Sequence, residues 1–504
     1  MARDSIEPYS VMFLRTVAFR PALRLATANK TAAQAVLKST SLKCLAFSTT
    51  TAGRSGNPPM SFPCIDRLET RQRDLSNGPE PTYEKVVTGY KVYRHNSPYA
   101  LDHGGILKKF DLAYETWGTL NADRSNAILI HTGLSGSSHA HSHPENQKPG
   151  WWEKFIGSGK AIDTDKFFVI CTNVLGGCYG STGPGSIDPE TNARYATTFP
   201  LLSVNDMVRA QFLLLDSLKI DKLYASVGAS MGGMQALCAA ALHSERVGRT
   251  ISISACARSH PYSIALRFAQ RQALMSDPNF NRGFYYDGVL PHVGMKLARS
   301  IATVTYRSGP EWELRFGRRR RAPDQPPMLC ADFLIETYLD HQSESFCLNY
   351  DANSLLYVSK AMDMFDISHS VTKKLHAQRE KTENILRSND NAYAAAGASN
   401  TVCMNVNESP QSATGSSEME SNEQIVEDLV AGVKNAMQPT LVLGVQSDIL
   451  FPVTQQKEIA NILRKAGNKN VTYYELDAMY GHDTFLIDLV NVGAAIKGHL
   501  ENSV

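Results

Sequence analysis

A serine in a glycine-rich turn is the side chain best placed to do chemistry. Ser230 lies in residues 228–233, which match the pattern G-x-S-x-G. The glycines permit a sharp turn between a strand and a helix, which lifts the serine hydroxyl off the edge of a sheet. The start of the following helix favours negative charge that develops near this hydroxyl. The pattern therefore predicts a nucleophilic serine.

A serine nucleophile needs a base, and the base needs an acid that orients it. Where a serine sits on such a turn, the partners follow in the order serine, acid, histidine. Asp448 follows the apolar run 441–445, and His482 follows the run 471–475. We predict that Ser230 is the nucleophile, that His482 is general base and then general acid, and that Asp448 holds the imidazole tautomer.

Acyl chemistry at Ser230 also requires two backbone N–H groups that stabilise an oxyanion. The first is expected from Met231, directly after the nucleophile. The second is expected from the loop after the apolar run 127–132, at Leu134. No metal is needed for this chemistry, and we predict none.

Short apolar runs separated by helical patterns must position these residues. The runs are apolar on both faces, as in strands of a parallel sheet covered by helices. They are residues 127–132, 167–172, 224–227, 250–254, 441–445 and 471–475. Helical spacing of apolar residues occurs between them, for example over 205–218 and 234–243. This alternation predicts an α/β fold.

Two segments interrupt the alternation and set the expected organisation. Residues 256–376 have a mostly helical pattern, which predicts a helical lid, whereas residues 386–424 are rich in small and polar side chains. The expected parts are a transit peptide and linker (1–65), the first core segment (66–255), the lid (256–376), a poorly ordered insertion (377–430) and the last core segment (431–504).

Composition excludes several classes of protein. The chain has 504 residues with 51 Lys+Arg and 49 Asp+Glu, a formal charge of +2, which argues against a protein that coats nucleic acid. No run of about 18 apolar residues occurs, so we expect no membrane span. Nine cysteines without a CxxC pair favour neither a disulfide scaffold nor a structural zinc site.

The basic residues are concentrated at the start of the chain. Residues 1–65 contain eight Lys or Arg and two acids, and the remaining 43 bases and 47 acids sum to −4. An Arg-rich, Ser-rich and acid-poor segment is typical of a mitochondrial transit peptide. A leader that started at Met12 would contain no acid. We therefore expect a mitochondrial protein, with a basic tail on a cytoplasmic protein as the alternative.

Many short motifs resemble the homoserine O-acetyltransferase family over about residues 85–370 and 435–495. These motifs are residues 150–152 (GWW), 173–178 (NVLGGC), 180–184 (GSTGP), 206–211 (DMVRAQ), 232–235 (GGMQ), 351–354 (DANS), 362–366 (MDMFD) and 481–483 (GHD). The resemblance implies an α/β-hydrolase fold, a mostly parallel sheet with a helical lid insertion, and a homodimer. It also implies acyl transfer from acyl-CoA to an amino-acid hydroxyl, with the triad on Ser230, Asp448 and His482.

The resemblance further implies two contacts with the acceptor amino acid. An arginine of the lid, Arg299, would bind its carboxylate, and Asp483, directly after the catalytic histidine, would bind its ammonium group. A guanidinium suits a carboxylate because it donates two parallel hydrogen bonds. From the residues alone, Arg299 could equally be a lid surface residue and Asp483 a helix N-cap.

The loop at residues 132–140 departs from the homoserine enzymes, which typically have Leu-Thr-Gly there. It is more similar to the branch that acts on L-serine, which includes fungal serine O-acetyltransferases and bacterial serine O-succinyltransferases. We therefore predict transfer from acetyl-CoA or succinyl-CoA to L-serine, for cysteine biosynthesis. L-Homoserine remains an alternative acceptor, since a pocket discriminates one methylene by only about 1–3 kcal/mol. An esterase is the alternative of another class.

Three other features could do chemistry but have a simpler interpretation. His139, His141 and His143 alternate as metal ligands on a strand would, but the usual spacing of further ligands is missing. Cys178 is interpreted as a packed small residue. The run 318–321, four arginines, is interpreted as a solvated basic loop in preference to a site for the 3′-phosphate of CoA.

Overall fold

The computed structural model describes residues 87–327, 331–388 and 421–502. The expected transit peptide, residues 1–65, therefore lies outside the described residues. Within the described ranges, no helix is both long enough and apolar enough to cross a membrane.

An eight-stranded sheet forms the centre of the described chain. In spatial order its strands are β1 (Lys91–His95), β4 (Phe110–Trp117), β8 (Phe168–Thr172), β5 (Ala127–His131), β9 (Ala225–Ala229), β10 (Thr250–Ile253), β11 (Thr440–Val445) and β12 (Val471–Leu476). Strand β4 is antiparallel to both of its neighbours, and all pairs from β8 to β12 are parallel. The parallel sheet predicted from the apolar runs is confirmed.

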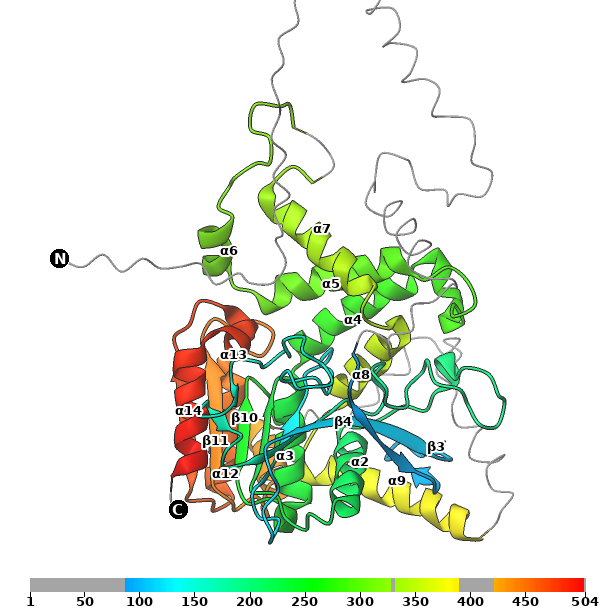
Figure 1. The fold of residues 1–504 in the computed structure, drawn as a ribbon, viewed down its shortest axis with the longest axis vertical. Helices are drawn as coiled ribbons and strands as arrows, with labels where there is room; N and C mark the ends of the chain where they lie inside the picture. The colour runs from blue at the N-terminus through cyan, green and yellow to red at the C-terminus, as the bar shows by residue number, and fades with distance from the viewer. Residues whose placement is uncertain (1–86, 328–330, 389–420, 503–504) are drawn as a thin grey trace, which may run out of the picture. The chain divides into compact units, whose positions relative to one another are not determined.

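Successive residues of the central strands enter two separate cores, as the alternation of side chains along a strand requires. Leu129 of β5 belongs to one core, and its neighbours Ile128 and Ile130 belong to the other. The helices α2 (Val204–Ser217), α3 (Met231–Leu242) and α12 (Val453–Lys465) pack into the first core. The helix α14 (Leu489–Glu501) packs into the second, on the opposite face of the sheet (Figure 1).

Short elements complete the core. They are β2 (Tyr99–Ala100) paired with β3 (Ile106–Leu107), β6 (Ile156–Gly157) paired with β7 (Ile162–Asp163), α13 (Thr484–Ile487), and the 3₁₀ turns η2 (Ala196–Thr198), η3 (Ser244–Arg246), η4 (Pro278–Gly283) and η6 (Gly481–Asp483).

A group of helices interrupts the sheet between β10 and β11, as the helical pattern predicts. These are α4 (Pro261–Met275), α5 (His292–Tyr306), α6 (Gly309–Arg315), α7 (Leu334–Cys347) and α8 (Ala352–Asp363), and α4, α5 and α7 lie together in Figure 1. Two arginines of α4, Arg267 and Arg271, form ion pairs with Asp363 of α8. All three side chains are at most 10% exposed, so these buried ion pairs join the first helix of the lid, α4, to its last, α8.

The segment 377–430, expected to be poorly ordered, is helical at both ends. Helix α9 (His369–Ser388) enters it and α11 (Asn422–Gly432) leaves it. Arg379 of α9 donates to the buried carboxylate of Asp102 at 2.6 Å, and this contact attaches the helix to the core. The residues between the helices, 389–420, lie outside the described ranges.

Candidate active site

Ser230 occupies a strained turn between β9 and α3. Its φ of 60° and ψ of −127° lie in a region that L-residues rarely adopt, and such strain persists only where the surroundings enforce it. The Ser230 N–H donates to the Ile253 carbonyl at 2.9 Å, while the Ser230 carbonyl accepts from Gly233 and Met234 at the start of α3. The residue is 7% exposed.

Glycines make this turn possible through close approach of backbones. A Cβ on Gly228 would lie 2.1 Å from the Gly232 carbonyl oxygen. A Cβ on Gly232 would lie 2.2 Å from the His131 carbonyl oxygen at the end of β5. The first turn of α3 therefore lies directly against the end of β5, next to the loop predicted to supply an oxyanion donor.

Asp448 and His482, 34 residues apart, meet at the ends of the last two strands. His482 Nδ1 lies 2.6 Å from Asp448 Oδ2, and both side chains are buried. Burial lowers the pKa of the His482 imidazolium, but the charge and hydrogen bond of Asp448 outweigh it, so the pKa is raised above its usual value. Among the residues that the structure describes, His482 Nε2 has no hydrogen-bond partner. This nitrogen is therefore free to accept a proton.

Neighbouring residues hold the His482 ring in place and join the two loops that carry Asp448 and His482. His482 stacks on Phe451 with 5.1 Å between ring centroids, and Phe485 meets its edge at 5.5 Å. The Phe451 N–H donates to Asp448 Oδ1 at 2.8 Å, which occupies the oxygen that His482 does not use. Ser447 accepts from the Gly481 N–H at 3.1 Å and donates to the Ala478 carbonyl, and so joins the two loops.

Of the two predicted oxyanion donors, Met231 directly follows Ser230, and Leu134 lies on a loop that approaches Ser230 through Gly133. Met231 is the first residue of α3, where backbone N–H groups have no partner inside the helix. The neighbouring loop comes close, since a Cβ on Gly133 would lie 3.9 Å from Ser230 Cβ. Tyr350 of the lid donates its hydroxyl to the Leu134 carbonyl at 2.8 Å and so restrains this loop.

Arg299 and Asp483 lie close enough for the charge of Arg299 to act on Asp483. Each also has a partner that the sequence did not predict. Arg299 lies over Phe346 at 4.3 Å, and Phe346 stacks on Tyr350. Asp483 forms its ion pair with Arg307, whose Nε lies 3.1 Å from Asp483 Oδ2. Asp483 makes no N-cap hydrogen bond to α13. Arg307 directly follows the last residue of α5, and no sequence motif marks it as a partner of Asp483.

The charge state of Asp483 is set by competing effects. Burial raises the pKa of this carboxyl, and the positive charges of Arg307, His482 and Arg299 oppose the rise, which leaves a raised pKa. Arg307 also donates to Glu311 at 2.7 Å, and Arg315 donates to the same carboxylate oxygen at 3.1 Å. Together these residues hold the Asp483 carboxylate next to His482, where it can bind an ammonium group.

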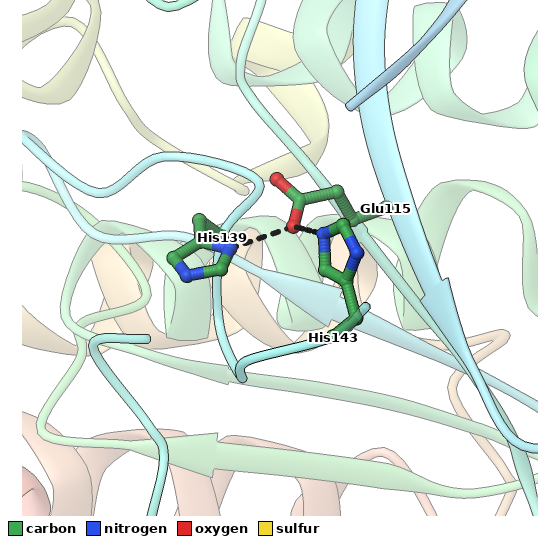
Figure 2. Close-up of side chains that lie close together, drawn as sticks. All are labelled: Glu115, His139 and His143. Carbon is green, nitrogen blue, oxygen red and sulfur yellow. Dashed lines mark hydrogen bonds and ion pairs between the residues drawn. The ribbon is translucent and has the colours of Figure 1, made fainter. Parts of the chain in front are cut away.

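The three alternating histidines lie on a loop, not on a strand. His139 and His143 converge on Glu115 of β4, whereas His141 lies 3.0 Å from Glu153 (Figure 2). Ligand atoms of Glu115, His139 and His143 lie within 4.8 Å of one another, close enough to hold a metal ion. The sequence pattern alone did not reveal Glu115.

A serine on a strained strand-to-helix turn, with an acid–histidine pair after later strands of the same sheet, defines an α/β hydrolase. Residues 126–489 match the α/β hydrolase fold family. A solved homoserine O-acetyltransferase from Bacillus anthracis is 25% identical, with a TM-score of 0.66 over 83% of this chain and 99% of that one. The solved structure of esterase E22 is 26% identical, with a TM-score of 0.64 over 82% of this chain and 100% of that one.

Sequence relatives narrow this class. The serine O-succinyltransferase of Schizosaccharomyces pombe is 56% identical over 89% of this chain and 96% of its own length. The serine O-succinyltransferase of Xanthomonas euvesicatoria is 40% identical over 83% of this chain and 99% of its own length. The chain belongs to the homoserine O-acetyltransferase family of α/β hydrolases, on the branch of the serine O-succinyltransferases, which confirms the resemblance.

Proposed function

We propose that the chain is a serine O-succinyltransferase, which transfers the succinyl group of succinyl-CoA to the hydroxyl of L-serine for cysteine biosynthesis. The likeness to the S. pombe enzyme, 56% over 96% of that enzyme's length, carries this choice of reaction. It favours succinyl over acetyl as the donor group and serine over homoserine as the acceptor.

The site supports a two-step mechanism. In the first step His482 Nε2 takes the proton of Ser230, whose oxygen attacks the thioester carbonyl carbon. The Met231 and Leu134 N–H groups stabilise the oxyanion. The C–S bond breaks, the proton passes from His482 to the CoA thiolate, and a succinyl ester remains on Ser230.

In the second step the same residues act on the acceptor. His482 takes the proton of the L-serine hydroxyl, the hydroxyl oxygen attacks the succinyl ester, and Ser230 leaves with the proton. Arg299 binds the carboxylate of L-serine, and Asp483 binds its ammonium group. The lid excludes water, since hydrolysis of the acyl-enzyme would waste the donor.

A panel of four reactions tests this proposal. L-Serine and L-homoserine are each combined with acetyl-CoA and with succinyl-CoA, and both CoA release and the ester product are measured. The highest kcat/KM is expected for L-serine with succinyl-CoA, and a Ser230→Ala chain should show no burst of CoA. A strong preference for homoserine would overturn the acceptor, and CoA release that is independent of acceptor would favour an esterase-like hydrolase.

We also propose that residues 1–65 direct the protein to mitochondria, and that the enzyme is a homodimer. The acid-poor, arginine-rich composition supports the first proposal, and family resemblance supports the second. Fusion of residues 1–65 to a fluorescent protein should give mitochondrial signal. The same fusion with its arginines changed to glutamate should not. Light scattering of the purified chain should give twice the monomer mass.

A further inference from the structure

The loop that carries Leu134 is tied to a buried carboxylate of the sheet. We call residues 132–148 the oxyanion loop. Glu115 of β4 is 2% exposed and meets three side chains of this loop. Ser138 Oγ donates to Glu115 Oε1 at 2.8 Å, and His139 Nδ1 and His143 Nε2 each lie 2.8 Å from Oε2. Figure 2 shows the two rings approaching the carboxylate from different directions.

The partners of the histidines fix where the protons lie. His139 Nε2 lies 2.7 Å from the Lys148 carbonyl, which only accepts, so this nitrogen carries a proton. The Glu145 N–H donates to His143 Nδ1 at 3.3 Å, so the proton of His143 is on Nε2 and points at Glu115. Glu115 thus already accepts from Ser138 and His143.

The donors that Glu115 already accepts decide whether His139 Nδ1, its remaining partner, carries a proton. A buried carboxylate that accepts hydrogen bonds at both oxygens is stabilised in its ionised form. His139 Nδ1 must then donate as well, which makes His139 an imidazolium. Burial lowers the pKa of His139, but the hydrogen bonds to Glu115 and to the Lys148 carbonyl outweigh it and raise the pKa. The buried negative charge of Glu115 is therefore paired with a positive charge.

A metal ion explains these contacts less well. Coordination through His143 Nε2 would move its proton to Nδ1, where it would face the Glu145 N–H. The two separations of 2.8 Å between histidine nitrogen and carboxylate oxygen are ordinary charge-assisted hydrogen bonds. The pattern of donors and acceptors is complete with protons alone.

We propose that Glu115 and His139 form a buried ion pair that positions the oxyanion loop for acyl transfer at Ser230. With Ser138 and His143 they form what we call the Glu115 clamp. The clamp holds the loop at residues 138–143, and Tyr350 holds it at Leu134. A displacement of about 1 Å at a reacting centre can lower a rate about 100-fold, so anchoring this loop matters for kcat. This inference rests on the proposed acyl transfer.

Substitutions that keep the shape but remove the charge test the clamp. Glu115→Gln and His139→Gln are each expected to lower kcat for succinyl transfer about 10- to 100-fold, a fraction of the loss of a whole oxyanion donor, with the KM for succinyl-CoA changed by less than about threefold. The double variant should lose less than the product of the two single losses, since it leaves no unpaired buried charge.

Asp163→Asn is the matched control. Asp163 is also a buried carboxylate, 6% exposed, and accepts from the Gly159 and Asp165 N–H groups at 2.9 and 3.0 Å, but it is the last residue of β7 and lies outside the oxyanion loop. This variant should lower the Tm while kcat stays within about twofold of the wild type. If folded Glu115→Gln and His139→Gln also keep the wild-type kcat, the clamp has no role in positioning and the proposal is wrong.

Two further measurements keep the test decisive. The burst of p-nitrophenol from p-nitrophenyl acetate reports acylation of Ser230 without CoA or L-serine. A slower burst in the clamp variants supports the clamp even if succinyl transfer itself fails. Nitrogen-15 NMR of labelled histidines in the His482→Ala chain should show one imidazolium that persists as the pH rises above the usual histidine pKa of about 6.5. Absence of that imidazolium, or a stoichiometric metal lost in His143→Gln, would overturn the proposal.

Discussion

Two carboxylate–imidazole pairs lie next to the central sheet, and they differ in the partner of the second imidazole nitrogen, Nε2. The distance from histidine Nδ1 to the carboxylate is 2.6 Å in Asp448–His482 and 2.8 Å in Glu115–His139. The two histidine side chains are 6% and 7% exposed, so burial does not distinguish them. His482 Nε2 has no hydrogen-bond partner among the described residues, whereas His139 Nε2 meets the Lys148 carbonyl at 2.7 Å.

The second ring nitrogen therefore decides what each pair can do. A histidine acts as a base only when one nitrogen is free to receive a proton from the reacting group. His482 satisfies this condition, and its carboxylate partner orients the ring and raises its pKa. His139 has both nitrogens engaged, so it holds its proton and serves as a fixed positive charge. The same two functional groups thus give a proton carrier in one region and an anchor in the other.

The largest expected effect comes from breaking the orienting role of Asp448. Asp448→Asn should lower kcat about 10⁴-fold, since the amide favours the wrong imidazole tautomer while the fold is retained. Glu115→Gln should cost far less, because the clamp acts only through the position of the oxyanion loop. Steady-state kinetics, with circular dichroism to verify the fold, compare the two. Equal losses would mean that the two pairs do not differ in role as argued.

The two regions also differ in how far the sequence could predict them. The apolar runs predict the strands, and the order serine, acid, histidine predicts the loops on which Asp448 and His482 meet. Glu115 carries no local signal, because its partners lie on a loop that follows another strand. The alternation of histidines suggested a shared face, but on this loop His141 faces Glu153.

The lid side of the site was only partly predictable for the same reason. Arg299 and Asp483 were expected from family resemblance, but the ion pair of Asp483 with Arg307 depends on how the end of α5 meets η6. Sequence patterns report the local period of an element and say little about where its ends meet other elements. The insertion was expected to be poorly ordered throughout, yet α9 extends to Ser388 because its residues contact the core through Asp102.

The next largest effect tests whether Asp483 binds the acceptor, in contrast to Asp448, which supports His482. Asp483→Asn should raise the KM for L-serine about 10- to 100-fold, the range for loss of a hydrogen bond to a charged group. The p-nitrophenyl acetate burst should be unchanged, because acylation needs no ammonium contact. A fall in the burst rate, with KM for L-serine unaffected, would place Asp483 in support of His482 and not in acceptor binding.

A smaller effect is expected from Arg307, which acts on the acceptor through Asp483. Arg307→Gln removes a charge that lowers the pKa of Asp483, so that pKa should rise further and Asp483 should protonate at a higher pH. The KM for L-serine should increase about 3- to 10-fold, and more strongly as the pH falls, since a protonated Asp483 loses its charge. Arg315→Gln is the control, because Arg315 shares Glu311 but has no ion pair with Asp483. Equal pH dependence in the two variants would contradict this role.

The smallest expected effect is a dependence on pH. Raising the pH should increase the activity and decrease the stability of the folded chain. His482 works as a base only when neutral, and its pKa is raised, so kcat/KM should fall with decreasing pH through a value above the usual histidine pKa of about 6.5. A raised pKa of a histidine stabilises the folded state below the pKa of the unfolded chain, and this stabilisation is lost as the pH rises through the folded pKa.

Both His482 and His139 have raised pKa values, so the Tm should decline over the same pH range in which activity increases. Glu115→Gln should remove the part of this decline that comes from His139 and leave the acid limb of kcat/KM in place. Asp448→Asn should shift the acid limb of its residual activity to lower pH, because its negative charge no longer raises the pKa of His482. Thermal unfolding and kcat/KM measured across pH distinguish these outcomes. If Glu115→Gln instead moves the acid limb, His139 exchanges its proton during turnover and is not a fixed charge.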